Sequence, residues 1–262
     1  MIRAMRTAAS GMNAQKLNAD TIANNLANVN TTGFKKSKLE FQDLLYQTYR
    51  MAGATSQVGS EVPVELQIGY GSRAVASQRI FSQGNLSQTY NPLDIAIDGN
   101  GFIPIALPNG TEAYTRDGAL KLSREGEIVT SDGYTLTAAI TIPAEAEEIS
   151  IGVDGTVTVR NAGETEVTDI GQITLVKFLN PSGLTALGRN LYIQTTSSGD
   201  PIEGIPGETG LGRIRQGFLE LSNVETVEEM VNLIIAQRAY EVNSKAIQTA
   251  EDMTQIANNL KR

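Results

Sequence analysis

The sequence predicts an α+β fold in which long helices at both ends of the chain form a coiled-coil-like core domain around an inserted all-β central region. Near both termini, apolar residues recur three and four positions apart, as on one face of a helix. Both segments carry the pentapeptide Ile-Ala-Asn-Asn-Leu, at residues 22–26 and 256–260. The middle of the chain instead alternates short apolar runs with turn residues, a pattern typical of strands.

The first helix is predicted over residues 2–30. Its apolar positions form a narrow stripe that is rich in alanine: Met5, Ala9, Met12, Ala19, Ile22, Leu26 and Val29. Thr31, Thr32 and Gly33 follow. We expect the helix to end there, because glycine readily takes the left-handed conformation that closes a helix C-terminus.

The last helix is predicted from residue 222 onward. Ser222 and Glu225 are spaced as a capping box, which satisfies two backbone donors at a helix start. The apolar residues then keep a near-heptad spacing: Val224, Val227, Val231, Ile234 or Ile235, Ala239, Val242, Ala246, Met253, Ile256 and Leu260. Such spacing over this length favours a coiled-coil seam. The acidic first turn and the basic pair Lys261 and Arg262 both suit the helix dipole.

A helical hairpin within one chain explains this periodicity as well as pairing between chains does. Four asparagines favour assembly: Asn24, Asn25, Asn28 and Asn30. Asparagine is a poor helix former unless its amide finds partners, and a two-helix pair would leave many amides merely solvated. In a bundle of several chains, such residues can set the register and the choice of neighbour.

Charge is distributed in a way that also suits pairing of the two ends. Residues 1–50 carry seven Lys and Arg against three Asp and Glu, whereas residues 220–262 carry four against seven. Exposed ion pairs contribute only ~0 to 1 kcal/mol each, so apolar packing must hold the helices together.

The β region is predicted over residues 72–219 as one or two β units, joined by a connecting segment at 36–71 to a helical core domain made of 1–35 and 220–262. Turns are expected at residues 108–110, 132–133, 154–155 and 162–163, where Asn-Gly, Asp-Gly and Ala-Gly pairs occur. Strands are expected at residues 73–81, 101–107, 113–115, 127–130, 134–142, 149–153, 156–160, 173–179 and 213–219.

Two segments before this region are less regular. Residues 52–71 are dominated by Gly, Ala, Ser and Gln and predict a loop or linker. Residues 35–49 are compatible with a short helix or an extended strand.

Composition excludes several classes of function. The chain has no Cys and no His, which removes disulfides, thiolate chemistry, the usual general base and the commonest zinc ligand. Aromatic residues make up only 5%, so we expect a core of Ile, Leu, Val and Ala.

An acidic middle region without a basic stripe argues against nucleic-acid binding. No apolar run is long enough to span a bilayer, no secretory signal is present, and the basic N-terminus is not expected to be a transit peptide.

We predict no catalytic, cofactor-binding or metal site. The segment from Asp94 to Gly101 lacks the alternating ligands and distal Glu of a calcium loop, so a strand that ends in a turn is expected. It is no phosphate cradle either, because no helix with a Lys and Ser pair follows. Glu145, Glu147 and Glu148 beside Pro143 are expected in a solvated loop rather than as paired acids for glycoside hydrolysis.

Several motifs resemble those of the bacterial flagellar rod and hook proteins. Residues 24–35, Asn-Asn-Leu-Ala-Asn-Val-Asn-Thr-Thr-Gly-Phe-Lys, are similar to that family's N-terminal signature, although Thr32 stands where many members have Pro. Residues 229–232 and 237–245 resemble its C-terminal signature. Residues 43–47, 82–89 and 113–118 are most similar to the members that form the distal rod.

This resemblance implies a structural axial protein of the flagellar basal body that self-assembles helically into the rigid tubular distal rod and transmits torque from motor to hook. Its implied partners are further copies of itself, proximal rod proteins, the hook protein, the peptidoglycan-ring and outer-membrane-ring proteins, and the flagellar type III export apparatus. The implied location is the periplasm-spanning rod, reached without a cleaved signal peptide. A proximal rod or hook-type role, a surface-binding module on a coiled-coil stalk, and an acidic glycan hydrolase are the alternatives.

Self-assembly is expected to use the two terminal segments. The candidate residues on the N-terminal side are Met5, Met12, Ile22, Asn24, Asn25, Leu26, Asn28, Val29, Gly33 and Phe34. Those on the C-terminal side are Val231, Ile234, Gln237, Arg238, Tyr240, Asn243, Met253, Ile256 and Leu260. With narrow apolar stripes and no large core, these helices should be largely disordered in a monomer and fold on assembly. The outer β units and residues 52–71 are expected to lock neighbouring subunits along the axis.

Overall fold

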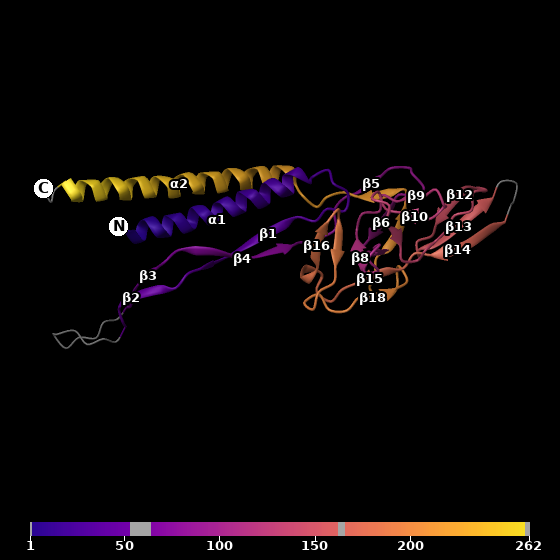
Figure 1. Ribbon diagram of the computed structural model, residues 1–262, viewed down its shortest axis with the longest axis horizontal. Coiled ribbons are helices and arrows are strands. Elements are labelled where there is room, and N and C mark those ends of the chain that lie inside the picture. The colour runs from indigo at the N-terminus through magenta and orange to yellow at the C-terminus, as the bar shows by residue number, and fades with distance from the viewer. Residues whose placement is uncertain (1, 53–63, 162–165, 260–262) are drawn as a thin grey trace. The chain divides into compact units, whose positions relative to one another are not determined.

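The computed structural model describes residues 2–52, 64–161 and 166–259 (Figure 1). The chain divides into two compact units. The helical unit comprises residues 1–27, 37–78 and 225–262, and the β-rich unit comprises residues 28–36 and 79–224. Three predicted features lie outside the described residues: the turn at residues 162–163, the assembly residue Leu260, and the basic helix end at Lys261 and Arg262.

Both predicted terminal helices are present in the helical unit. Helix α1 spans Ile2–Ala27 and helix α2 spans Thr226–Asn259, and the two pack against each other. Helix α1 ends three residues earlier than predicted, and a turn occupies residues 28–30. Gly33 does take a left-handed conformation, with φ of 66°, but it lies beyond this turn.

The predicted capping box at Ser222 and Glu225 is wrong. Helix α2 begins at Thr226, and the Ser222 hydroxyl accepts a hydrogen bond from the amide of Val224 at 3.3 Å. The reason is that residues just before the helix are bonded into the β-rich unit: the amide of Asn223 donates to the carbonyl of Phe34 at 3.4 Å.

The remainder of the helical unit consists of paired strands. Strand β1, Ser37–Asp43, pairs with β4, Ser72–Arg79, and β2, Tyr46–Arg50, pairs antiparallel with β3, Leu66–Gly69 (Figure 1). Residues 37–43 and 46–50 are thus extended, which resolves the ambiguity over 35–49. The loop predicted over residues 52–71 is wrong at 66–69, where strand β3 pairs with β2. Residues 53–63 of that segment lie outside the described part of the chain.

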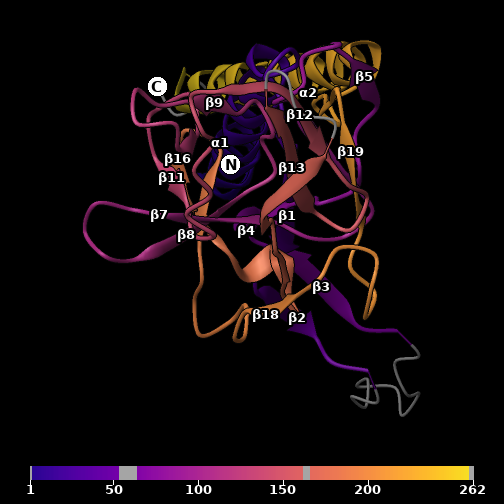
Figure 2. The ribbon, with the colours of Figure 1, turned by 90° about the vertical axis from the view of Figure 1, so that its right-hand side faces the viewer.

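The β-rich unit contains one extended sheet and several small ones (Figure 2). The larger sheet has the strand order β16-β17-β8-β7-β11-β10-β9. Its strands are β7 (Ile103–Ala106), β8 (Glu112–Thr115), β9 (Lys121–Leu122), β10 (Ile128–Val129), β11 (Thr135–Leu136), β16 (Thr185–Gly188) and β17 (Leu191–Ile193). All these neighbours pair antiparallel, consistent with short connections.

The smaller sheets are also antiparallel. Strands β12 (Ala146–Ile151), β13 (Thr156–Asn161) and β14 (Val167–Gln172) form one of them. The strand pairs are β15 (Leu175–Lys177) with β18 (Ile202–Gly204), β6 (Ile95–Asp98) with β19 (Arg213–Gln216), and β5 (Leu86–Gln88) with β20 (Phe218–Glu220). A short 3-10 turn, Pro181–Gly183, precedes β16. Each pair brings distant parts of the chain together, and β19 and β20 lead back toward α2.

The main core is aliphatic, as composition predicts. Ile95, Ile103, Val157 and Leu175 are among its fully buried members. A second cluster is aromatic and was not predicted: Phe102, Tyr114, Phe178 and Tyr192 are buried and meet edge to face, with Phe81 packed against them. Few aromatic residues are therefore enough for a second core, because each buries a large area and they gather in one place.

Residues 94–101 and the acidic residues after Pro143 were also assigned a conformation from sequence. The segment before Gly99 is a strand, as predicted, and it ends in a bend at Gly99 and Asn100. Glu145 lies in an exposed turn, as predicted. Glu147 and Glu148 are exposed, as predicted, but the predicted loop is wrong there, because both lie on β12, where Glu148 pairs with Arg160 of β13 at 2.5 Å. In the described part of the chain, none of the helices is both long enough and apolar enough to cross a membrane.

Candidate functional site: an assembly surface and a buried ion cluster

Helix α2 carries an apolar surface that its own chain leaves uncovered. We call it the α2 stripe; its members are Val227, Val231, Ile234, Ile235, Val242, Met253 and Ile256. All are exposed, Val242 at 66% and Ile256 at 59%. Ile234 and Ile235 are adjacent, and the other successive members are three, four, seven or eleven positions apart, so at 100° per residue all of them lie along one side of the helix. A contiguous exposed apolar surface of this kind marks an interaction site.

A different face of α2 meets α1. Ala236 and Ala250 are buried there, and Asn243 lies so close to Gly11 of α1 that a Cβ on this glycine would be 3.0 Å from the Asn243 amide nitrogen. Small side chains let the two backbones approach closely. The intramolecular seam is therefore built from small and polar residues, and the apolar stripe stays available.

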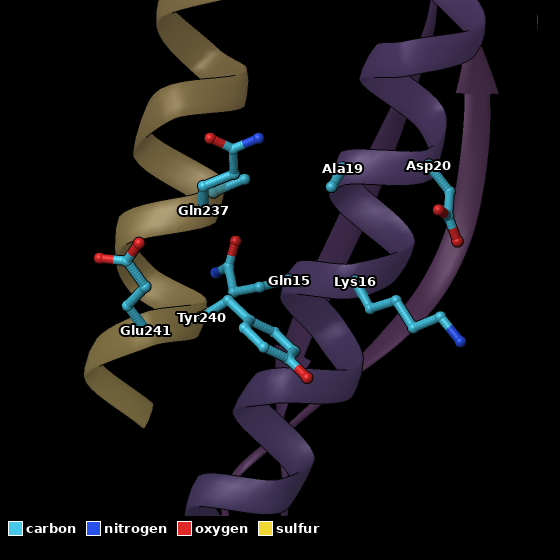
Figure 3. A pocket seen from close by; sticks show the side chains of 8 residues that line it. Gln15, Lys16, Ala19, Asp20, Gln237, Tyr240 and Glu241 are labelled. Atoms are coloured by element: carbon cyan, nitrogen blue, oxygen red, sulfur yellow. The ribbon is translucent and has the colours of Figure 1, made fainter. Parts of the chain in front are cut away.

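The groove between the helices has a volume of about 430 Å³ (Figure 3). Gln15 and Ala19 of α1 and Gln237 and Tyr240 of α2 line it, and the Tyr240 ring reaches from α2 toward α1. Two predicted assembly residues, Gln237 and Tyr240, thus lie together. Lys16 and Asp20, on its α1 edge, point away from α2.

The other predicted assembly residues fall into three environments. Asn24 and Arg238 are exposed, and Arg238 pairs with Glu241 at 3.1 Å. The half-buried ones are Met5, Met12, Leu26, Asn28, Val29 and Asn243. The buried ones are Ile22, Asn25, Gly33 and Phe34.

Asn25 uses its amide within its own chain. It is 2% exposed, its amide nitrogen donates to the carbonyl of Ser37 at 2.9 Å, and its amide oxygen accepts from the Ser37 backbone amide at 3.0 Å. The side chain thereby mimics a strand partner and fixes the start of β1 beside α1. This position contributes to the fold of the helical unit in addition to any contact with a neighbour.

The β-rich unit contains a buried ion cluster of Lys35, Arg116 and Glu220. The Lys35 ammonium lies 2.6 Å from one oxygen of the Glu220 carboxylate, and the Arg116 Nε lies 2.8 Å from the other. The Glu220 side chain is fully buried, and its first oxygen also accepts from the amide of Gly84 at 2.9 Å. One carboxylate thus receives three donors from three distant segments.

Backbone carbonyls accept further hydrogen bonds from both cations of the cluster, whose two positive charges share one carboxylate. Arg116 donates to the carbonyls of Gly101 at 3.1 Å and Gly99 at 2.9 Å, and Lys35 donates to that of Ser82 at 2.7 Å. Burial lowers the pKa of Lys35 to about 8; Arg116 also lowers it, whereas Glu220 opposes the change. Removing Glu220 would leave two buried cations without their anion, which costs ~3 to 5 kcal/mol.

Sequence reasoning missed this cluster. Lys35 and Glu220 are 185 positions apart, and Arg116 and Glu220 are 104 positions apart, so no local spacing links them. The available signal was that Lys35 closes the N-terminal motif and that Arg116 lies within the Ala-Tyr-Thr-Arg-Asp-Gly motif.

The acidic residues weighed as metal ligands have other partners. Asp98 pairs with Arg215 at 2.7 Å, and the Asp94 carboxylate accepts from the Asn91 amide at 2.9 Å. Across residues 2–52, 64–161 and 166–259, no group of three or more Asp and Glu side chains is placed to hold a metal ion.

Three protein-family models match separate parts of the chain. Residues 5–35 match the flagella basal body rod protein, residues 96–159 match the D1 domain of the flagellar hook protein FlgE/F/G, and residues 215–260 match the C-terminal region of the flagellar basal body rod FlgEFG proteins. Each matched part contributes one member of the buried ion cluster.

Relatives of the chain are similar over its full length. The flagellar basal-body rod protein FlgG of Borreliella burgdorferi is 53% identical over 100% of both chains. FlgG of Bacillus subtilis is 41% identical over 100% of both chains, whereas the flagellar hook-basal body complex protein FlhP of the same organism is 30% identical, also over 100% of both. This chain therefore belongs to the family of flagellar basal-body rod proteins that includes FlgG.

Proposed function

We propose that the protein is the subunit of the rigid, tubular distal rod of the flagellum, which self-assembles helically and transmits torque from motor to hook. As a flagellar basal-body rod protein it is a structural, axial component of the basal body. The single observation that supports self-assembly most directly is the α2 stripe, an apolar surface that the subunit itself leaves exposed.

A second copy of the chain is the occupant that we propose for this stripe. Charge supports the choice: helix α1 carries three basic residues against one acid, and α2 carries two against five. An α2 from one subunit can therefore meet an α1 from another with opposite charges along the contact. A contact between two different surfaces that does not close on itself builds an open helical polymer.

The comparison within one organism supports the choice of a rod subunit. The chain is 41% identical to FlgG of Bacillus subtilis but 30% identical to FlhP. The partners that we propose follow from family membership: proximal rod proteins, the hook protein, the ring proteins of the peptidoglycan and outer membrane, and the type III export apparatus. We propose no catalytic activity for the subunit.

Strands β2 and β3 provide a second proposed contact between subunits. Tyr46, Tyr49, Leu66 and Ile68 are exposed on this ribbon although all are large and apolar or aromatic. In an assembled rod, these side chains would pack on a neighbouring subunit and oppose sliding along the axis. A polymer locked in this way resists bending, which a drive shaft requires.

A charge placed in the α2 stripe tests the proposal. We expect Val242→Lys to raise the critical concentration for polymerisation by at least about tenfold, because it replaces a side chain whose burial contributes ~1.5 to 3 kcal/mol. Gln248→Lys is the matched control, since Gln248 is exposed on the same helix but lies outside the stripe. Sedimentation and electron microscopy give the polymer fraction. Equal assembly of both variants would refute a role for the stripe.

A further inference from the structure

The chain passes between its two units four times, after residues 27, 36, 78 and 224. On the β-rich side, the segments that lead to these crossings are residues 28–36, 79–84 and 220–224. They come from three distant parts of the sequence. All the contacts described below lie within the β-rich unit.

Asn223 joins these segments through its side-chain amide. Its oxygen accepts from the backbone amide of Lys36 at 2.7 Å, and its nitrogen donates to the carbonyl of Ile80 at 2.9 Å and to that of Ser82 at 3.2 Å. The amide of Ile80 in turn donates to the carbonyl of Lys36 at 2.9 Å. One side chain thus ties the segment that follows α1 to the one that follows β4.

Glu220 joins the same segments through charge. Its carboxylate holds Lys35, Arg116 and the amide of Gly84, and its backbone carbonyl accepts from the amide of Gly33 at 2.8 Å. Gly33 cannot be replaced without strain, because its φ is 66° and a Cβ there would lie 2.7 Å from the amide nitrogen of Asp117. Residues 28–36 are therefore held tightly against the β-rich core.

We propose that Glu220 and Asn223 form a crossing clamp. The bonds of these two side chains form and break cooperatively, so a force applied at one of the four crossings is shared by all four. Without such bonds, each crossing is a single stretch of backbone that can rotate about its φ and ψ angles, so a force on it would move only the residues of that stretch. In the clamp, pulling residues 28–36 also pulls 79–84 and 220–224. Its use in transmitting torque rests on the proposed rod function, but the clamp itself is a property of the single subunit.

Hydrogen exchange on the full-length chain tests whether the clamp closes as one unit. We expect Glu220→Gln to accelerate exchange of the amides of Gly33, Lys36, Ile80 and Gly84 together, by about 100-fold, because two buried cations lose their anion. The amides of strand β13 should be unchanged. Acceleration of Gly84 alone, or equal acceleration of β13, would overturn the proposal.

Two other variants keep this test decisive if Glu220→Gln fails to fold. Lys35→Met leaves the pair of Arg116 and Glu220 intact, and Asn223→Ala removes only the amide bonds. Asn223→Ala should accelerate the same set of amides, by a smaller factor than Glu220→Gln. Lys35→Met removes a cation whose burial is costly, so it should change exchange of that set by one common factor. Independent changes at single amides in these variants would contradict a shared clamp.

Force spectroscopy tests the mechanical role. Handles at the two ends of the full-length chain apply force through α1 and α2 to residues 28–36 and 220–224, which the clamp joins. We expect the β-rich unit of Glu220→Gln and Asn223→Ala to unfold at lower force than that of the wild type. Glu125→Gln, which neutralises an exposed acid of the same unit, is the control. An unfolding force equal to that of the wild type in the clamp variants would overturn the mechanical role, even if rods still assemble. If the variants unfold at lower force but the wild type does not form rods, the clamp is supported and the proposed rod function is not.

Discussion

At the scale of single residues, the most demanding feature of the molecule is the pairing of two buried cations with one buried carboxylate. Burying a charge is costly unless hydrogen bonds and an opposite charge compensate for it. Here Glu220 pairs with both Lys35 and Arg116, and backbone carbonyls accept the donors that remain. A hydrophobic triad could have been at least as stable, so the cluster is better explained by the definite geometry that it imposes on three chain segments.

The titration of Lys35 gives a prediction at this scale. Its pKa in the folded chain is about 8, below the ordinary value of 10.5, because the site disfavours the charged form. The folded state therefore releases this proton more readily than the unfolded state. Lys35 costs stability below pH 8, and this cost disappears as the pH rises from about 8 to 10.5.

Lys35→Met lacks this titration and serves as the reference. We expect the free energy of unfolding of the wild type to rise relative to that of the variant between pH 8 and 10.5, by at most on the order of 3 kcal/mol. Subtracting the variant removes the contributions of other groups, including Tyr114, whose pKa burial raises to about 12. Urea unfolding at a series of pH values measures the difference. If the free energies of unfolding of the wild type and of Lys35→Met change in parallel with pH over this range, the site does not shift the pKa of Lys35.

At the scale of elements, the terminal helices combine a seam of small residues with an uncovered apolar stripe. The seam with α1 uses Ala236, Asn243 and Ala250, which bury little apolar area, whereas the α2 stripe remains in water. Most helical stability in proteins comes from packing of an apolar face. We therefore expect helices α1 and α2 to be only marginally stable in a free subunit.

Circular dichroism should consequently show a gain of helix on polymerisation. The magnitude of the signal at 222 nm, per residue, is expected to increase when the wild type assembles, because the α2 stripe then acquires partners. Val242→Lys held at the same concentration should stay unassembled and show no gain. Equal helicity before and after assembly would mean that the subunit helices are already complete.

The elements that could be predicted from sequence are those with a local signal. Both helices follow from apolar periodicity, and strands such as β13 follow from alternation beside an Asp-Gly turn. Strands β14, β16 and β18 were missed because they are edge strands without buried apolar residues. The periodicity also located the α2 stripe but not the face that meets α1, because Ala236, Asn243 and Ala250 on that face are small or polar and give a weaker apolar pattern than the Val and Ile residues of the stripe. The ion cluster was out of reach, since only the folded chain brings its members together.

At the scale of the whole molecule, the two ends of the chain share one unit while the middle forms another. A subunit of this design exposes an apolar helix face for assembly and keeps its charged cluster buried in the β-rich unit, where it orders the connecting segments. We propose that subunits assemble by packing the α2 stripe of one copy on the helices of others.

Electron cryo-microscopy of the assembled protein, at a resolution that shows side chains, tests this claim most directly. We expect open-ended tubes in which Val231, Val242 and Ile256 contact helices of neighbouring subunits and the ribbon of β2 and β3 lies against an adjacent copy. A closed oligomer of fixed size, or tubes in which the α2 stripe faces solvent, would contradict the account.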